Sequence, residues 1–297
     1  MRTIATPEDL AITKSLWLRI WEFIVGPEDE RIFKPYGVQA DGAGRIYVAD
    51  SVARVIHVFD VEGKNYRKIG DPQQLKFPID IALDRKGRIF VSDVDLGSVL
   101  RFDSTGRLVG EIGRDGGLKR PAGLVYNPLN DLLYVVDVAL HEILVYEPEG
   151  SLKQRFGRRG SGVGEFNYPT NITADKKGNL YVTDSLNFRV QLFDSQGRFV
   201  SAFGRPGDAL GEFSKPKGIA LDSEGHIYVV EGLFDTILIY DRQGRLLLNF
   251  GGPGNGPGQF WLATGIFIDP SDRIYVADSY NRRIQVFQYL RERKQIP

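Results

Sequence analysis

Six carboxylates recur along this chain at nearly even spacing, and a ring of such groups could surround a divalent cation. Each ends a short apolar run such as IYVAD or LYVTD, and the six are Asp50, Asp93, Asp137, Asp184, Glu231 and Asp278. Calcium takes six to eight oxygen ligands, so the pattern first suggests a metal site. However, a residue present in every repeat serves first to build the repeat. We expect these acids to accept hydrogen bonds from the loop that follows them, and at Asp184 and Asp278 from Arg189 and Arg283 as well.

The sequence contains few residues that could support other kinds of catalysis. The chain has no cysteine, which excludes disulfides and thiolate chemistry. Its three histidines, His57, His141 and His226, fall at different points of the repeat, so they should not converge as ligands of a catalytic zinc. Neither a G-x-S-x-G motif nor a G-x-x-x-x-G-K-[ST] loop is present. We therefore assign no catalytic residue and no metal ligand.

The places where the repeat fails are better candidates for a site than the places where it matches. Asp80 and Asn171 stand at a position where the other four repeats have glycine, namely Gly37, Gly123, Gly218 and Gly265. Either these two side chains take part in binding, or they cap strand ends and hold channel water. The candidate binding residues at the channel mouth and on the adjoining loops are Tyr36, Asp80, Thr170, Asn171, Lys217, Trp261 and Thr264.

The elements that position these residues are short strands in a repeat of 43 to 47 residues. In the fourth repeat four apolar runs, which we name strands A to D in chain order, cover 171–175, 180–184, 190–194 and 199–203. Asp-x-x-Gly turns, such as DKKG and DSQG, join A to B and C to D. A repeat of this length made only of short strands is typical of a propeller blade. We predict an all-β fold, a six-bladed β-propeller with four antiparallel strands per blade.

The two ends of the chain indicate how the ring closes. The run LWLRIWEFIVG ends at Gly26 like a strand D that lacks the three strands before it, and the last repeat lacks a strand D. We therefore expect an N-terminal strand to complete the last blade, so that no sheet edge is left unpaired. The predicted organisation is an N-terminal tail at 1–15, the propeller at 16–289 and a C-terminal tail at 290–297.

Two runs carry a resemblance to a known family: DSLNFRVQLFD from Asp184 and DSYNRRIQVF from Asp278, which follow the strands LYVT and IYVA. Over about residues 16–288 the chain resembles the NHL-repeat six-bladed propellers. Members of that family mostly serve as protein- or RNA-binding platforms, and some relatives are lyases with a metal in the channel. Other six-bladed propellers are calcium-dependent lactonases. Bacterial relatives are often exported or lipid-anchored, so the resemblance implies an exported or periplasmic home.

Composition narrows the partner. The 297 residues include 38 basic and 38 acidic side chains, and this balanced charge gives no indication of a polyanionic partner. A basic arc can be drawn through Arg158, Arg159, Arg205, Lys215 and Lys217, but five charges on a neutral protein are typical of a solvated surface, which disfavours nucleic acid. No apolar stretch is long enough for a membrane span, and we expect a soluble chain.

We therefore expect a non-catalytic binding or scaffold propeller that engages a protein partner and needs no cofactor. The D–A and B–C connections share one face and contain all of the length variation, so this face should bind. The loop aromatics that could anchor a partner are Phe166, Tyr168, Phe188, Phe234, Trp261 and Tyr280. The alternative is a calcium- or other metal-dependent hydrolase or lyase centred on Asp80 and Asn171, with Gln39, Thr170 and Thr264 as further oxygen donors. RNA binding is the least favoured reading.

Overall fold

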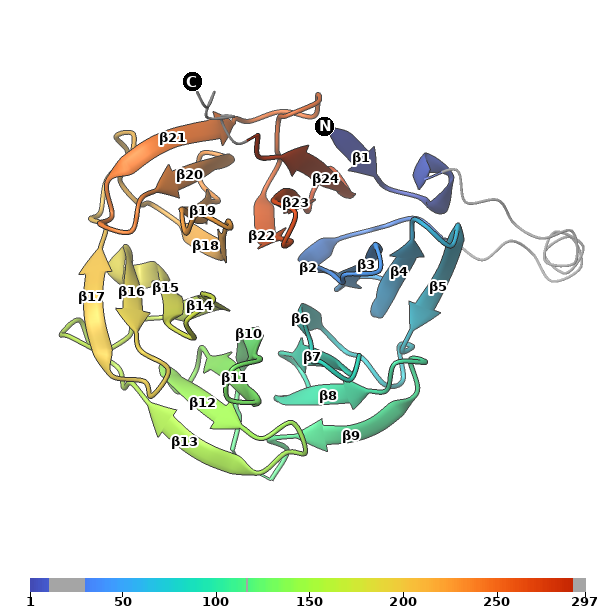
Figure 1. Ribbon diagram of the computed structural model, residues 1–297, viewed down its shortest axis with the longest axis horizontal. Coiled ribbons are helices and arrows are strands. Elements are labelled where there is room, and N and C mark those ends of the chain that lie inside the picture. The colour runs from blue at the N-terminus through green and yellow to red at the C-terminus, as the bar shows by residue number, and fades with distance from the viewer. Residues whose placement is uncertain (11–29, 116, 291–297) are drawn as a thin grey trace, which may run out of the picture.

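Short strands arranged as six four-stranded antiparallel sheets surround a central channel in the computed structural model, which describes residues 1–10, 30–115 and 117–290 (Figure 1). Strand A of each blade lies at the channel and strand D at the periphery. The blades are formed by β2 (Pro35–Ala40), β3 (Arg45–Asp50), β4 (Val55–Asp60) and β5 (Asn65–Ile69); β6 (Pro78–Leu83), β7 (Ile89–Asp93), β8 (Ser98–Phe102) and β9 (Leu108–Ile112); β10 (Pro121–Asn127), β11 (Leu132–Asp137), β12 (Glu142–Tyr146) and β13 (Leu152–Phe156); β14 (Pro169–Ala174), β15 (Leu180–Asp184), β16 (Arg189–Phe193) and β17 (Phe199–Phe203); β18 (Pro216–Leu221), β19 (Ile227–Glu231), β20 (Thr236–Tyr240) and β21 (Leu246–Gly251); and β22 (Ala263–Ile268), β23 (Arg273–Asp278), β24 (Arg283–Gln288) and β1 (Arg2–Ile4). Two short 3-10 helices, η1 (Pro7–Leu10) and η2 (Ser185–Asn187), complete the described elements. The predicted fold class is confirmed.

The ring closes through the N-terminus, as predicted. Strand β1 pairs antiparallel with β24, with Arg2 opposite Val286 and Ile4 opposite Ile284, and so becomes the outer strand of the sixth blade. The run at 16–26, which the sequence suggested for this role, lies outside the described residues. The described closing strand falls instead within residues 1–15, which the sequence assigned to a tail.

The Asp-x-x-Gly segments form tight hairpin turns, for a reason visible at Asp84. Its Oδ1 accepts hydrogen bonds from the backbone N–H groups of Lys86 (2.9 Å) and Arg88 (2.8 Å), while Gly87 adopts φ of 73°. A left-handed residue is required at this point of the turn, and glycine adopts that conformation at no steric cost. In the sixth blade Asp272 takes the glycine's place with φ of 61°.

The core lies between blades rather than within any one of them. Between the fifth and sixth blades, for example, Tyr228, Ile237, Phe260, Ile266 and Val276 are buried together. Fully burying a side chain of this size contributes about 1.5–3 kcal/mol. The B strands are covered on both faces and are almost entirely buried, as in β15 and β19, which explains their apolar runs.

Two faces of the ring follow from the alternating strand directions. The B–C loops and the D–A connections lie on one face, which we call the loop face, and the A–B and C–D turns lie on the other, the turn face. Among the described residues no helix is long and apolar enough to cross a membrane.

Candidate functional site

The six acids at the ends of the B strands are buried and hold the loop face together. Asp93 accepts backbone hydrogen bonds from Lys76 (2.7 Å) and Phe77 (3.0 Å) in the incoming connection, and from Asp95 (3.1 Å) and Leu96 (3.0 Å) in its own B–C loop. Equivalent bonds reach the other acids, including the salt bridges from Arg189 to Asp184 and from Arg283 to Asp278 that the sequence suggested. The carboxylates therefore tie each loop to the preceding connection and are not arranged as a metal ring.

The acid at the end of β3 shows how hydrogen bonds can keep a buried carboxylate charged. Burial of Asp50 opposes its ionisation, but hydrogen bonds from the His57 ring and from the backbone of Ala53 and Phe33 outweigh this effect and lower its pKa. In the fifth blade the balance is reversed, because burial raises the pKa of Glu231 despite its hydrogen bonds from the backbone. These groups serve the scaffold in both cases.

Neighbouring blades approach each other closely near the start of the A strands. A Cβ built on Gly37 would lie 2.6 Å from Asp80 Oδ1, and one built on Gly123 would lie 2.5 Å from Asn171 Cα. Gly218 and Gly265 are equally close to the backbone of the next blade. Glycine is required at these four positions by the close approach of neighbouring blades, and Asp80 and Asn171 fill the space that those glycines leave.

Asp80 and Asn171 meet above the glycine of the blade between them. Asn171 Nδ2 lies 3.3 Å from Asp80 Oδ2, which also accepts from the Leu124 backbone (3.2 Å), while Oδ1 accepts from the Ile81 backbone (2.9 Å). We call this contact the Asp80–Asn171 bridge. It joins the second, third and fourth blades and accounts for the two departures from the repeat.

The bridge lies deep in the channel, and this location changes the acidity of Asp80. Loss of solvent around the carboxylate raises its pKa to about 7, and the hydrogen bonds from Ile81, Leu124 and Asn171, which favour the charged form, only partly offset the rise. Near neutral pH the Asp80 carboxyl in the bridge is therefore neutral in part of the molecules and charged in the rest.

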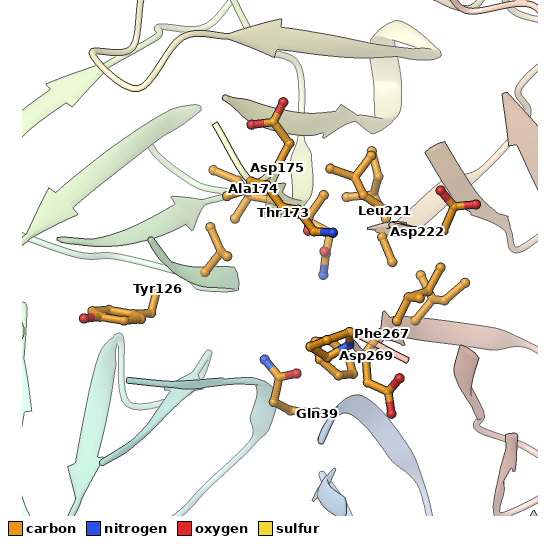
Figure 2. Close-up of a pocket in the computed structure, with 18 of the residues that line it drawn as sticks. Gln39, Tyr126, Thr173, Ala174, Asp175, Leu221, Asp222, Phe267 and Asp269 are labelled. Atoms are coloured by element: carbon orange, nitrogen blue, oxygen red, sulfur yellow. The ribbon is translucent and has the colours of Figure 1, made fainter. Parts of the chain in front are cut away.

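The bridge divides the channel into two chambers, since Asp80 and Asn171 line both. The lower chamber, of about 570 Å³, opens toward the turn face. Figure 2 shows Gln39 pointing into it and the carboxylates of Asp175, Asp222 and Asp269 at its edge. Those carboxylates accept hydrogen bonds from their own A–B turns, so they are committed to the turns.

The second cavity, of about 320 Å³, opens on the loop face, and we call it the mouth chamber. Tyr36, Phe77 and Tyr168 form aromatic walls, and the rings of Tyr36 and Phe77 meet edge to face with 5.9 Å between centroids. Val94 and Val138 add apolar surface. A cavity of this size with mostly apolar walls and a few polar groups is typical of small-molecule sites.

The charged groups at the mouth chamber are cationic, apart from Asp80 in the floor. Arg120, Lys215 and Lys217 line it, and within the described part of the chain none of the three has a carboxylate within 4.0 Å. Burial lowers the pKa of Lys217 to about 8, Lys215 adds to the decrease, and Asp235 and Glu231 partly oppose it. Two other members of the basic arc are paired, Arg158 with Glu165 and Arg205 with Glu212.

Most of the candidate binding residues chosen from the sequence lie at the mouth chamber. Tyr36, Thr170 and Lys217 line the mouth chamber, and Asp80 and Asn171 form its floor. The Thr264 hydroxyl is held in the wall by Ser279 Oγ (2.8 Å) and by the Tyr36 carbonyl (3.0 Å).

Trp261 lies outside the chamber, on the rim. It is exposed, and its ring meets that of Tyr280 edge to face at 5.5 Å. Lys34 Nζ lies 5.4 Å from the Tyr280 centroid and 5.9 Å from that of Tyr36. An aromatic and cationic surface therefore runs from the rim to the chamber.

The expected calcium ligands are brought together only in part, since Asp80, Thr170, Asn171 and Thr264 line the mouth chamber. Gln39 belongs to the lower chamber, Thr264 bonds within the wall, and both oxygens of Asp80 already accept hydrogen bonds. Among the residues that the structure describes, no three histidine, cysteine, aspartate or glutamate side chains are placed to hold a metal ion. His57, His141 and His226 bond to Tyr66, the Tyr168 backbone and Asp222 respectively, in three different blades.

Sequence reasoning missed Phe77 and Arg120 and assigned Lys215 only to a solvated arc. All three immediately precede the proline that begins strand A, as in FP, RP and KP. Comparison of this position across the repeats would have found them. Phe166, conversely, is fully buried and cannot be an anchor, because it packs between blades together with Phe193.

A second feature of the loop face is a set of exposed apolar side chains at one repeat position. Two residues after each strand-B acid, the B–C loop presents an outward side chain, and we call the apolar members the apolar ring: Val52, Leu186, Leu233 and Tyr280. Asp95 and Ala139 take this position in the second and third blades. Exposed Tyr168, Phe234 and Trp261 lie on the same face, and Phe188 is half-buried.

The fold and the sequence together define the chain as a six-bladed β-propeller. The sequence matches the family DUF5128, described as a 6-bladed beta-propeller, at residues 175–241 and 222–292. No curated protein matches the chain.

Solved structures of mixed function share the fold. Virginiamycin B lyase from Staphylococcus aureus superposes with a TM-score of 0.64 at 15% identity, over 87% of this chain and 85% of that one. An auxiliary nutrient binding protein from Bacteroides thetaiotaomicron gives 0.69 at 14% identity, over 87% and 70%. Regucalcin, a calcium-binding protein from Agrobacterium tumefaciens, gives 0.62 at 16%, over 82% of each chain. At these identities the likeness extends to the fold alone.

Proposed function

We propose that this propeller is a non-catalytic binding protein that engages a protein partner through its loop face. The observation that carries the proposal is the apolar ring, in which the same loop position exposes Val52, Leu186, Leu233 and Tyr280. Exposed apolar side chains that converge on one face are typical of interaction sites, whereas isolated ones are ordinary. Trp261 beside Tyr280 supplies an aromatic pair of the kind that dominates interface energies.

Exposed apolar residues also occur on the outer strands, and these are arranged differently. They are spread around the circumference on separate blades, as at Leu108, Leu152, Val200 and Leu248. Those on the loop face occupy one repeated loop position around the channel, and one of them, Tyr280, has the Lys34 Nζ atom 5.4 Å from its ring centroid. The partner surface that this arrangement suits carries apolar side chains with acidic groups beside them.

We also propose that the blades are NHL repeats and that the protein acts outside the cytoplasm. The support for the first point is the role of the motif in the fourth and sixth blades. Arg189 donates to the carbonyls of Ser161, Gly162 and Glu165, and Arg283 donates to the equivalent carbonyls of Asn255, Gly256 and Gln259, two D–A connections further along the chain. The D-S-x-N-x-R-[VI]-Q sequence thus clamps the long D–A loops. The second point rests on the resemblance alone.

The alternative function is a metal-dependent hydrolase or lyase at the channel mouth. It is favoured by one observation, the raised pKa of Asp80 in a cavity, which is common among catalytic acids and bases. A melting curve with calcium or zinc tests it, because a ligand at a hundred times its Kd adds about 2.7 kcal/mol of stability. A metal-dependent rise that is lost in Asp80→Asn would favour this alternative over the binding role.

A matched pair of substitutions tests the binding proposal. Leu233 on the loop face and Leu129 on the turn face are each 59% exposed, so Leu233→Asp and Leu129→Asp make the same change on opposite faces. Wild-type protein immobilised in a lysate of its source should retain a partner that mass spectrometry identifies and that is then purified. We expect Leu233→Asp to lower the affinity for that partner by at least about tenfold and Leu129→Asp to leave the affinity unchanged.

Two results would count against the proposal. Equal binding by the two variants would place the interface elsewhere, and so would loss of binding in Leu129→Asp alone. Trp261→Ala provides a second reading of the loop face, with an expected loss of about 2 kcal/mol if the indole is an anchor.

A further inference from the structure

The mouth chamber contains three cations that form no salt bridge in the described residues, although Asp235 and Glu231 lie close enough to raise the pKa of Lys217 and Asp80 forms the floor. Several arginines on this face are in salt bridges, such as Arg189 with Asp184 (2.8 Å) and Arg283 with Asp278 (2.7 Å). In the described residues Arg120, Lys215 and Lys217 form no such bridge, although all three line one cavity. Like charges that converge on a partly dry cavity repel one another, and an anion between them removes the repulsion.

The fifth blade is modified to place Lys217 in this cavity. After the strand-B acid the other blades have serine or valine, whereas this blade has Gly232. A Cβ at Gly232 would lie 2.6 Å from Lys217 Cε and 3.0 Å from Nζ, so the glycine makes room for the lysine stem. Within the described part of the chain, the Nζ group makes one long hydrogen bond, to the Ala263 carbonyl at 3.5 Å. The ammonium group is therefore partly buried and poorly satisfied.

The walls and floor of the chamber define what could accompany an anion. Tyr36, Phe77 and Tyr168 supply flat apolar surface, and Val138 adds to it. The Asp80–Asn171 bridge closes the floor, so that an occupant enters from the loop face. A volume of about 320 Å³ holds a compact group such as one aromatic ring with a short side chain.

We propose that the mouth chamber binds a carboxylate attached to an aromatic or similarly flat apolar group. Lys217 pairs with the carboxylate, Arg120 and Lys215 contribute positive potential, and the aromatic walls contact the apolar group. This site goes beyond the proposed partner surface and does not depend on it. The same chemistry has two sources, a free organic acid and the C-terminal carboxylate of a peptide that ends in an aromatic residue.

Titration calorimetry at pH 6.5 on the full chain tests the proposal with a pair of probes that differ only in charge. We expect 3-phenylpropanoate to bind and 3-phenylpropanamide to bind at least about tenfold more weakly, because a charge-assisted hydrogen bond is lost. Lys217→Met should weaken the acid by at least about tenfold. Lys153→Met, which removes an exposed lysine paired with Glu147 on outer strand β13, should not.

Two peptides distinguish the sources. A hexapeptide ending in phenylalanine is tested with a free and with an amidated C-terminus. Tighter binding of the free-carboxylate peptide than of 3-phenylpropanoate assigns the chamber to chain ends, and binding of the small acid alone assigns it to free organic acids. Equal binding of acid and amide, no binding of either up to about 10 mM, or an unchanged affinity in correctly folded Lys217→Met would overturn the proposal. The first two results need no variant.

Discussion

Replacement of Asp80 by asparagine should abolish a specific part of the pH dependence of stability. An aspartate that titrates at 3.8 in the unfolded chain and at about 7 in the folded protein holds more protons in the folded state between these values. Stability then falls as pH rises through that window, by up to about 1.36 kcal/mol per pH unit. Asparagine resembles the neutral acid in shape and does not titrate, so it lacks this fall.

The magnitude follows from the two pKa values. Wild-type protein should lose about 2.5 kcal/mol relative to Asp80→Asn between pH 5 and pH 8, with most of the loss below pH 7. This value is an upper bound, since part of the Asp80 side chain faces the channel. Urea unfolding at pH 5, 6, 7 and 8 measures the difference, and titration of other groups cancels between the two proteins.

Asp95→Asn is the matched control, because it removes a charge from the exposed B–C loop of the same blade and leaves the Asp80–Asn171 bridge intact. A difference between wild type and Asp80→Asn that stays constant from pH 5 to pH 8 would refute the reasoning. So would a difference that changes in the opposite direction.

Three further predictions concern the close packing of neighbouring A strands, the D–A loop held by Arg189, and the mouth chamber. Gly123→Ala should cost about 1–3 kcal/mol in urea unfolding, because its Cβ would lie 2.5 Å from Asn171 Cα, whereas Gly42→Ala, with no atom within 4 Å, should cost little; equal losses would contradict the close packing of blades. Arg189→Met should cost about 3–5 kcal/mol and speed hydrogen exchange at 158–166, because Asp184 loses its charged partner and the loop loses its clamp; unchanged exchange there would exclude the clamp. Binding of 3-phenylpropanoate should weaken as pH rises past about 7, where Asp80 ionises, and again past about 8, where Lys217 loses its proton, while Tyr36, whose pKa burial raises, stays neutral; affinity that is flat from pH 6 to pH 9 would contradict the assignment.

The architecture could be predicted because the repeat states the same local rules six times. Asp-x-x-Gly turns, apolar runs of strand length and a missing last strand leave one way to close the ring. The register of the closing strand could not be predicted in the same way. Arg2–Ile4 contains three residues and no repeated motif, and only its pairing with β24 reveals it.

The candidate site was predictable where it departs from the repeat and hidden where it follows the repeat. Asp80 and Asn171 stood out against glycine, yet their contact across the third blade depends on the space above Gly123. Arg120 and Phe77 occupy a position that differs among the blades, so nothing within one repeat marks them. Whether a side chain such as Phe166 points outward or between blades depends on packing that sequence spacing alone does not fix.

Hydrogen exchange with the captured partner tests the central claim, that the loop face is the binding surface, most directly. Exchange is measured on the propeller alone and at saturation with the purified partner. The account predicts protection in the B–C loops at 51–54, 185–188, 232–235 and 279–282 and no change in the A–B turns of the opposite face. Protection confined to those turns or to the outer strands would contradict it.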